Sequence, residues 1–227
     1  MLNQPTLEKL RALKLRGMAE AFSEQLQKPM SDLDFESRLG LLIDREWYLR
    51  ENRRLDRRLS QAKLKENASI EDIDYQHSRN LNKSVMQELS RLQWVHQHFN
   101  LLITGPTGCG KTYIACALAH KACLAGLTAR YYRLPRLWHE LKVSKANGTY
   151  PAWLSQLAKI DVLILDDWGL ITPDIEQRRD FAYFTRNEQG FQSESEQGFQ
   201  HDSNTDFTVI EHKHLAKVAL WLRLLRL

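Results

Sequence analysis

No stretch of the 227-residue sequence is apolar over the 18 or so residues that a membrane-spanning helix needs. Cysteine is scarce, and three residues, an odd number, argue against a disulfide framework. The first residues carry charged side chains at short intervals, so they lack the apolar core of a secretory signal. Basic residues only slightly outnumber acidic ones, with 32 Lys and Arg against 28 Asp and Glu. The resulting net charge of +4 does not by itself indicate a nucleic-acid partner. We therefore expect a soluble, cytoplasmic protein.

Residues 1–95 have the pattern of an all-helical module. Glycine is absent from residues 41–100 and proline from residues 30–105, which favours long helices. Ser31, followed three residues later by Asp34, resembles a capping box at the start of a helix. After it, apolar residues recur at helical spacing and predict one apolar face made of Phe35, Leu39, Leu42, Ile43 and Trp47.

Strand and helix patterns alternate over residues 96–180. The run Leu101–Thr104 is short, apolar and partly β-branched, and it ends in a glycine-rich loop followed by a helical stretch, Thr112–Ala125. Further strands are predicted at Ala129–Arg133 and Val162–Leu165. This alternation is typical of an α/β fold with a parallel sheet that helices cover on both faces.

Residues 181–227 interrupt the alternation. The first part is rich in Gln, Ser, Glu and Asn, and the pentapeptide Glu-Gln-Gly-Phe-Gln occurs at 188–192 and again at 196–200. Such low apolar content predicts an irregular, disordered tail. Residues 214–227 are leucine-rich and basic, and they predict a short amphipathic helix. We therefore expect the parallel sheet to be incomplete.

The glycine-rich loop fits the phosphate-binding pattern G-x-x-x-x-G-K-[ST], known as Walker A, at every position. Its glycines permit a backbone that surrounds phosphate oxygens with N–H groups, while Lys111 can meet the β- and γ-phosphates and the Thr112 hydroxyl can ligate Mg²⁺. An ordinary glycine-rich turn is the alternative, but it does not account for the position between an apolar strand and a helix. We predict ATP and Mg²⁺ as cofactors, bound by Gly105, Pro106, Thr107, Gly108, Cys109, Gly110, Lys111 and Thr112.

Two carboxylates, Asp166 and Asp167, directly follow the apolar strand Val162–Leu165. Functional groups gather at the carboxyl ends of parallel strands, where Asp166 can hold Mg²⁺ and Asp167 can orient or deprotonate an attacking water. Alone, such a pair is more typical of a solvated turn or a helix cap. Downstream of a complete phosphate loop, the functional interpretation is favoured.

A basic segment lies inside the helical module. Between Arg45 and Lys65 there are eight basic and three acidic residues. Arginine binds phosphate groups well, so a DNA-contacting surface is one interpretation. The other is a solvated helix face with pairs such as Arg53–Asp56, and charge alone does not decide between them. The candidate DNA-binding residues are Arg50, Arg53, Arg54, Arg57 and Arg58.

Four segments together resemble a known family: Arg45–Arg58, Ser69–Tyr75, Leu101–Thr112 and Asp161–Gly169. They are similar to the IstB-like helper ATPases of bacterial insertion sequences, which belong to the AAA+ class and resemble the DnaC helicase loaders. The resemblance covers about residues 5–180. It implies an ATP-dependent protein that assembles as a homo-oligomer on double-stranded DNA and directs the transposase encoded by the same element to target sites.

The same resemblance assigns roles to individual residues. It implies that Lys111 is a catalytic nucleotide ligand, that Thr112 and Asp166 are Mg²⁺ ligands, and that Asp167 is the catalytic residue that activates water. The Arg50–Arg58 helix would belong to the family's DNA-contacting and subunit-contacting amino-terminal module.

The resemblance stops near Asp180. The family continues with a strand that ends in a polar sensor residue and with an arginine that reaches the neighbouring subunit's nucleotide, and neither pattern is evident after this point. A frameshift would produce such a change. We therefore expect impaired ATP turnover. The alternatives to a transposition helper are a DnaC-like helicase loader, a truncated ATP-binding remnant that does not hydrolyse ATP and, more remotely, a small-molecule P-loop kinase.

Overall fold

The computed structural model describes residues 3–28, 32–75, 81–168, 175, 177, 208–212 and 218–224. Two compact units divide the chain, Met1–Arg57 and Arg58–Leu227. Within the described ranges, no helix has the length and apolar character to cross a membrane.

The first unit contains α1 (Asn3–Ala12), α2 (Arg16–Gln27) and most of α3 (Phe35–Ala62). The helix predicted after Asp34 is confirmed, and the Asp34 carboxylate caps it by accepting a hydrogen bond from the Ser37 N–H at 2.8 Å. Ser31, the other half of the predicted capping box, lies outside the described residues.

A buried carboxylate joins α2 to α3 inside this unit. Glu46 Oε2 accepts the backbone N–H groups of Gly17 and Met18 at 2.7 and 3.3 Å, in the first turn of α2, which no side chain of its own caps. Arg50 Nε donates to Glu46 Oε1 at 2.7 Å. The helices approach so closely that a Cβ on Gly17 would lie 2.7 Å from the Arg45 carbonyl oxygen, so this position requires glycine.

The residues predicted to form an apolar face do lie in a helix, α3, but their side chains are largely exposed to solvent. Phe35, Ile43 and Trp47 are 69%, 52% and 59% exposed. Periodicity places these residues on one side of a helix, but it does not supply a partner surface. Among the described residues, the first unit instead buries few apolar side chains, namely Leu7, Ala19 and Ala21.

A five-stranded sheet organises the second unit. Its strands are β1 (Asn100–Gly105), β2 (Ala129–Arg133), β3 (Val162–Trp168), β4 (Thr208–His212) and β5 (Val218–Leu224). The spatial order is β2-β3-β5-β1-β4; all neighbours are parallel except β1 and β4, which are antiparallel. The predicted α/β class is confirmed in this unit, as are the three strands predicted before residue 180.

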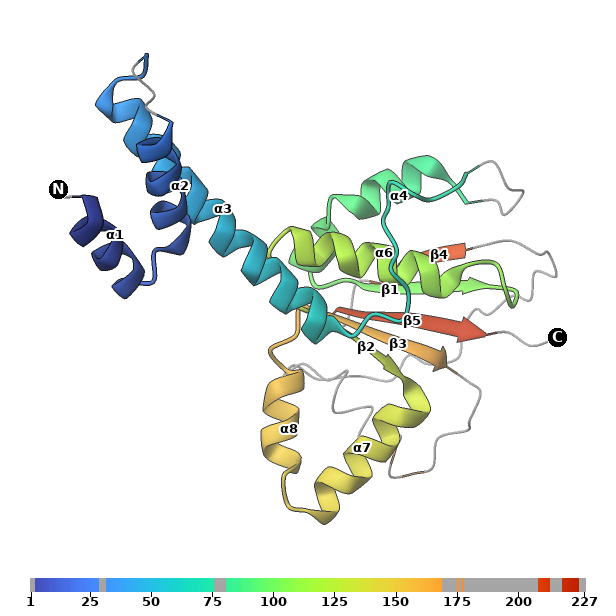
Figure 1. The fold of residues 1–227 in the computed structure, drawn as a ribbon. Helices are drawn as coiled ribbons and strands as arrows, with labels where there is room; N and C mark the ends of the chain where they lie inside the picture. The colour runs from blue at the N-terminus through green and yellow to red at the C-terminus, as the bar shows by residue number, and fades with distance from the viewer. Residues whose placement is uncertain are drawn as a thin grey trace. The chain divides into compact units, whose positions relative to one another are not determined.

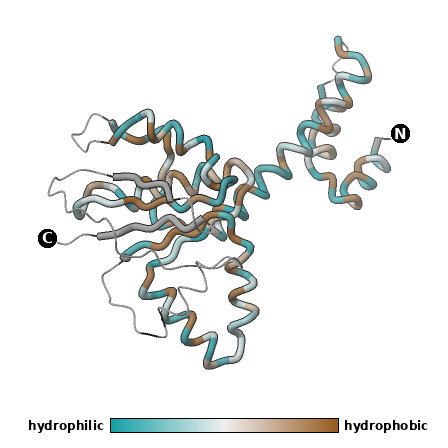
Figure 2. The backbone as a smooth tube through the Cα atoms, turned by 180° about the vertical axis from the view of Figure 1, so that it is seen from behind, coloured by the Kyte–Doolittle hydropathy of each residue, from teal (hydrophilic) through white to brown (hydrophobic). Residues whose placement is uncertain are grey.

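Helices cover both faces of the sheet. They are α4 (Lys83–Ser90), α5 (Gln93–His96), α6 (Lys111–Leu124), α7 (Leu134–Ala146) and α8 (Tyr150–Leu157). In Figure 1, α4 and α6 lie on one face and α7 and α8 on the other. In Figure 2 the tube is brown along β1, whereas hydrophobic and hydrophilic residues alternate along the helices, as expected for elements with one buried side.

Along the chain, the boundary between the two compact units lies after Arg57, whereas the sequence predicted a module boundary at residue 95. Residues 58–95 group with the sheet, because α4 packs on α6 and α5 packs on β1. Met86, Leu89 and Trp94 are buried in these contacts.

The prediction of an irregular tail and an incomplete sheet is corrected at two strands. Residues 208–212 form β4, and residues 218–224 form β5, where we expected an amphipathic helix. A short apolar run suits a buried strand as well as a buried helix, and periodicity alone does not distinguish the two. Here the run Val218–Leu224, which is apolar except at Arg223, occupies the central position between β1 and β3. Central strands of parallel sheets are typically rich in apolar residues. The rest of the predicted tail lies outside the described residues.

Candidate nucleotide-binding site

The glycine-rich loop connects the carboxyl end of β1 to the start of α6. Gly105, Gly108 and Gly110 have φ angles of 152°, 84° and 95°, which other residues rarely adopt. A Cβ on Gly108 would meet nothing within 4 Å, so that glycine is required by its backbone conformation rather than by crowding. Pro106, Thr107 and Gly108 are exposed. The loop therefore has an open outer surface.

Two features suit this loop to an anion. Helix α6 begins at Lys111 without a side-chain cap, so the N–H groups of its first turn have no partner within the helix. The Lys111 side chain is buried, and its Nζ donates to the carbonyl oxygens of Gly105 and Pro106 at 2.7 and 2.6 Å. An ammonium and a row of backbone donors at one place fit a phosphate group.

The structure brings the two predicted Mg²⁺ ligands together across a sequence separation of 54 residues. The Thr112 hydroxyl donates to Asp166 Oδ2 at 3.0 Å, and Asp166 is 4% exposed at the end of β3. Its other oxygen accepts the Asp167 N–H at 2.8 Å. A hydroxyl and a carboxylate beside a phosphate loop are the hard oxygen ligands that Mg²⁺ prefers, so these residues fit the ion.

A tyrosine that the sequence analysis did not identify completes this cluster. The Tyr131 hydroxyl donates to Asp166 Oδ2 at 2.6 Å, from the neighbouring strand β2. Burial, followed by the hydrogen bond to Asp166, raises the pKa of Tyr131, so the phenol stays protonated and acts as a donor. Alternation along β2 places residues 129, 131 and 133 on one side of the sheet, and this period-2 pattern is the signal that could have revealed it.

Asp167 lies at an irregular point of β3. Its φ of 62° is in the left-handed region, and the pairing of β3 with β5 shifts register between Leu165 and Trp168. Such bulges re-aim side chains and occur near functional sites. The Asp167 carboxylate accepts a hydrogen bond from Arg133 Nε at 2.5 Å, and this ion pair raises the pKa of Arg133. Asp167 is therefore held at the same end of the sheet as Asp166, with an arginine as its partner.

The five arginines predicted to bind DNA have different surroundings. Arg50 pairs with Glu46, and Arg54 pairs with Glu51 at 2.5 Å. Arg58, in the second unit, donates to the Cys123 carbonyl oxygen at 2.7 Å, near the carboxyl end of α6.

The two remaining arginines, Arg53 and Arg57, are exposed and lie four residues apart on α3. Among the described residues, no ion pair joins Arg53 to Asp56, the pairing that a purely solvated face would offer.

A phosphate loop after the first strand of a parallel sheet, with a carboxylate at the end of a nearby strand, defines the P-loop NTPase class. The model of the family described as "IstB-like ATP binding protein" matches residues 8–190. The chain belongs to this family.

Individual relatives agree with the family assignment. The chain is 46% identical over 195 residues to "Insertion sequence IS1162 putative ATP-binding protein" of Pseudomonas fluorescens, an alignment that covers 85% of this chain and 84% of the relative. It is 41% identical over 194 residues to "Putative insertion sequence ATP-binding protein y4pL" of Sinorhizobium fredii, covering 85% and 79%. A third relative, from insertion sequence IS21 of Pseudomonas aeruginosa, is 32% identical over 171 residues, covering 75% and 64%.

Proposed function

We propose that this protein is a cytoplasmic transposition helper that binds ATP·Mg²⁺ and double-stranded DNA and directs the transposase of its element to target DNA. The observation that carries the nucleotide part is the Thr112–Asp166 hydrogen bond, which joins the phosphate loop to the carboxylate of β3. The insertion-sequence relatives support the transposition context.

The nucleotide chemistry follows from the positions of the side chains. Lys111 would exchange its loop carbonyl partners for phosphate oxygens, and the first-turn N–H groups of α6 would donate to the same phosphates. Thr112 and Asp166 would hold Mg²⁺. When bound, the ion neutralises charge on the β- and γ-phosphates.

Turnover makes a further demand on Asp167. To orient water or accept its proton, the carboxylate must face the γ-phosphate, whereas in this structure it pairs with Arg133. Sequence after residue 180 offers no evident arginine for a neighbouring subunit, and such an arginine is worth about 10³–10⁵ in rate in comparable sites. We therefore propose that the chain binds ATP well and hydrolyses it slowly.

The DNA part of the proposal rests on α3. Arg53 and Arg57 are the arginines of this helix best suited to phosphate groups, because the other candidates already pair with carboxylates or a carbonyl. Contacts of this kind are independent of base sequence, which agrees with a helper that acts on target DNA in general.

Transposase recruitment tests the proposal directly. Immobilised duplex DNA is incubated with the transposase of the same element, with or without this protein and ATP. The transposase should stay on the DNA only when both are present, and Lys111→Ala should abolish that retention. Retention of a replicative helicase in place of the transposase would instead identify a helicase loader, and retention without this protein would contradict the proposal.

A further inference from the structure

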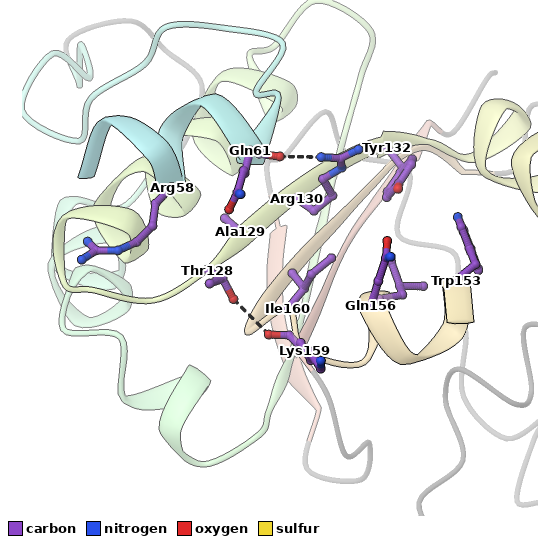
Figure 3. A pocket seen from close by; sticks show the side chains of 11 residues that line it. Arg58, Gln61, Thr128, Ala129, Arg130, Tyr132, Trp153, Gln156, Lys159 and Ile160 are labelled. Atoms are coloured by element: carbon purple, nitrogen blue, oxygen red, sulfur yellow. Dashed lines mark hydrogen bonds between the residues drawn. The ribbon is translucent and has the colours of Figure 1, made fainter. Parts of the chain in front are cut away.

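A pocket lies in the sheet unit, away from the glycine-rich loop. Its volume is about 440 Å³, within the range of about 300–1,000 Å³ found for small-molecule sites. Figure 3 shows side chains from the end of α3, the start of β2, α8 and the segment before β3 around it. Its lining includes Gln61, Arg130, Trp153, Gln156 and Lys159.

The pocket is separate from the candidate nucleotide site because it lies at the other end of the strands. Thr128 and Ala129 are at the amino end of β2, and Lys159 and Ile160 precede β3. The phosphate loop, by contrast, follows the carboxyl end of β1. Strands β1, β5, β3 and β2 all run parallel, so the loop and the pocket lie at opposite ends of these strands.

All charged side chains that line the pocket are basic: Arg58, Arg130 and Lys159. Asp161, a neighbouring carboxylate, accepts the N–H and the hydroxyl of Thr128, both at 2.7 Å. Asp161 itself is not one of the lining residues. The lining therefore favours an anion.

Arg130 is held in position. Its Nη1 donates to the Gln61 carbonyl oxygen at 2.6 Å, and its guanidinium lies 5.3 Å from the centre of the Tyr132 ring (Figure 3). A guanidinium has five N–H donors, so one bond to a carbonyl leaves donors for a ligand. Lys159 is exposed and can supply a second positive charge.

The other lining residues suit more than a bare anion. Trp153 is half-buried in α8, and Gln61 and Gln156 carry exposed amide side chains. A ring to stack on, amides for a base edge and cations for a phosphate are the three elements with which proteins bind unpaired nucleotides. An acidic peptide would use only the cations.

We propose that this pocket binds one unpaired nucleotide of a DNA strand, with the base against Trp153, one of its two flanking phosphates at Arg130 and the other at Lys159. The inference extends the DNA-binding part of the proposed function and rests on it. It assigns the sheet unit a direct contact with DNA at the end of the strands remote from ATP.

Salt-dependent binding of the full-length protein to a fluorescent oligothymidylate tests the cationic part. Lys159→Gln should lower the slope of log affinity against log salt by about 0.7, the value for one single-strand phosphate contact. Lys142→Gln is the matched control, since Lys142 is an exposed lysine of α7 outside the pocket and should leave the slope unchanged. Gln156→Glu, which adds a negative charge to the lining, should weaken binding as well. An unchanged slope in Lys159→Gln would overturn the proposal.

Cross-linking tests the stacking part without altering the fold. Oligonucleotides that carry 5-iodouracil should cross-link on illumination to the peptide containing Trp153, and duplex DNA should compete less well than single strands. Cross-links confined to other peptides, or competition by thymidine monophosphate or polyglutamate as strong as that by DNA, would contradict a DNA-strand site.

The two proposals fail in different ways. A protein that binds no DNA of any form contradicts the proposed function itself. A protein that binds DNA through α3, yet keeps its salt slope in Lys159→Gln and gives no cross-link at Trp153, contradicts the pocket alone.

Discussion

The hydroxyl of Tyr131 donates to the same oxygen of Asp166, Oδ2, that accepts the Thr112 hydroxyl, at 2.6 and 3.0 Å. Three side chains from β2, β3 and α6 therefore meet at one carboxylate oxygen. A buried carboxylate needs such donors, since it has lost its water. The arrangement holds Asp166 in place before any ion binds.

Tyr131→Phe should destabilise the sheet unit and weaken its binding of Mg²⁺-nucleotide. A hydrogen bond to a charged, buried group contributes about 1.5–3 kcal/mol to the free energy of unfolding. Denaturant unfolding measures the first effect, and the Mg²⁺ concentration for half-maximal nucleotide binding, which should rise, measures the second. Tyr48→Phe is the control, because Tyr48 is 60% exposed in the other unit. Equal Mg²⁺ dependence in Tyr131→Phe and the wild type would show that Tyr131 does not position Asp166.

Lys111→Ala should weaken ATP binding by about 2–3 kcal/mol, the scale of a lost charge-assisted contact. Titration of a fluorescent ATP analogue measures this change. Lys142→Ala, at an exposed position of α7, should bind as the wild type does. Unchanged affinity in Lys111→Ala would exclude the loop as the nucleotide site.

ATP turnover should lie well below the ordinary enzymatic range of about 1 s⁻¹ and above, with or without duplex DNA. Arg133→Gln should raise it by no more than about fivefold, because Arg133 is 59% exposed and an exposed ion pair is worth only about 0.2–1 kcal/mol. Steady-state phosphate release measures both. Arg136→Gln, which removes a comparable exposed pair with Glu140, should have no effect. DNA-stimulated turnover above 1 s⁻¹ that Asp167→Asn abolishes would contradict slow hydrolysis.

Duplex DNA binding should depend on Arg53 and Arg57 more than on their neighbours. Replacing both with Ala removes two phosphate contacts and should lower the log–log salt slope by about 1.8, at about 0.9 for each contact. The matched control replaces Arg50 and Arg54, whose side chains pair with Glu46 and Glu51. Equal losses in the two double variants would mean that α3 contributes only its overall charge.

Acid should loosen the first unit through Glu46. Burial opposes ionisation of this carboxyl, but hydrogen bonds from Arg50, Met18 and Gly17 outweigh it and lower its pKa below the ordinary 4.5. A group with a lowered pKa in the folded state stabilises the fold above its unfolded-state pKa, and this stabilisation is lost as the pH falls through the folded-state value.

Unfolding of the first unit, followed at pH values from neutral to below 4, measures this dependence. Glu46→Gln should be less stable than the wild type at neutral pH, and the difference should shrink in acid. A difference that stays constant with pH would show that the charge of Glu46 does not link α2 to α3.

Much of the sheet unit could be predicted from the sequence. The glycine-rich loop and the strands at Leu101, Ala129 and Val162 depend on residues adjacent in the chain: apolar runs of strand length, and glycines where the backbone needs positive φ. The sequence also predicted that Thr112 and Asp166 lie close enough to share Mg²⁺, because a parallel sheet brings the carboxyl ends of its strands to one edge. Their direct hydrogen bond was not predicted.

Other features depend on which parts of the chain pack together, and local sequence patterns do not predict this packing. The run Val218–Leu224 is apolar enough for a helix or a strand, and the central place between β1 and β3 made it a strand. Likewise, the sequence around Glu46 indicated only a basic helix segment. In the structure, Gly17 approaches this segment closely, and the Glu46 carboxylate caps the start of α2. The sequence by itself determined the chemistry of the phosphate loop, since each residue there acts through its own backbone or charge. Only the tertiary structure decided the partners of Asp166, Asp167 and Glu46, because hydrogen bonds between distant residues form only where packing brings their atoms within about 3 Å.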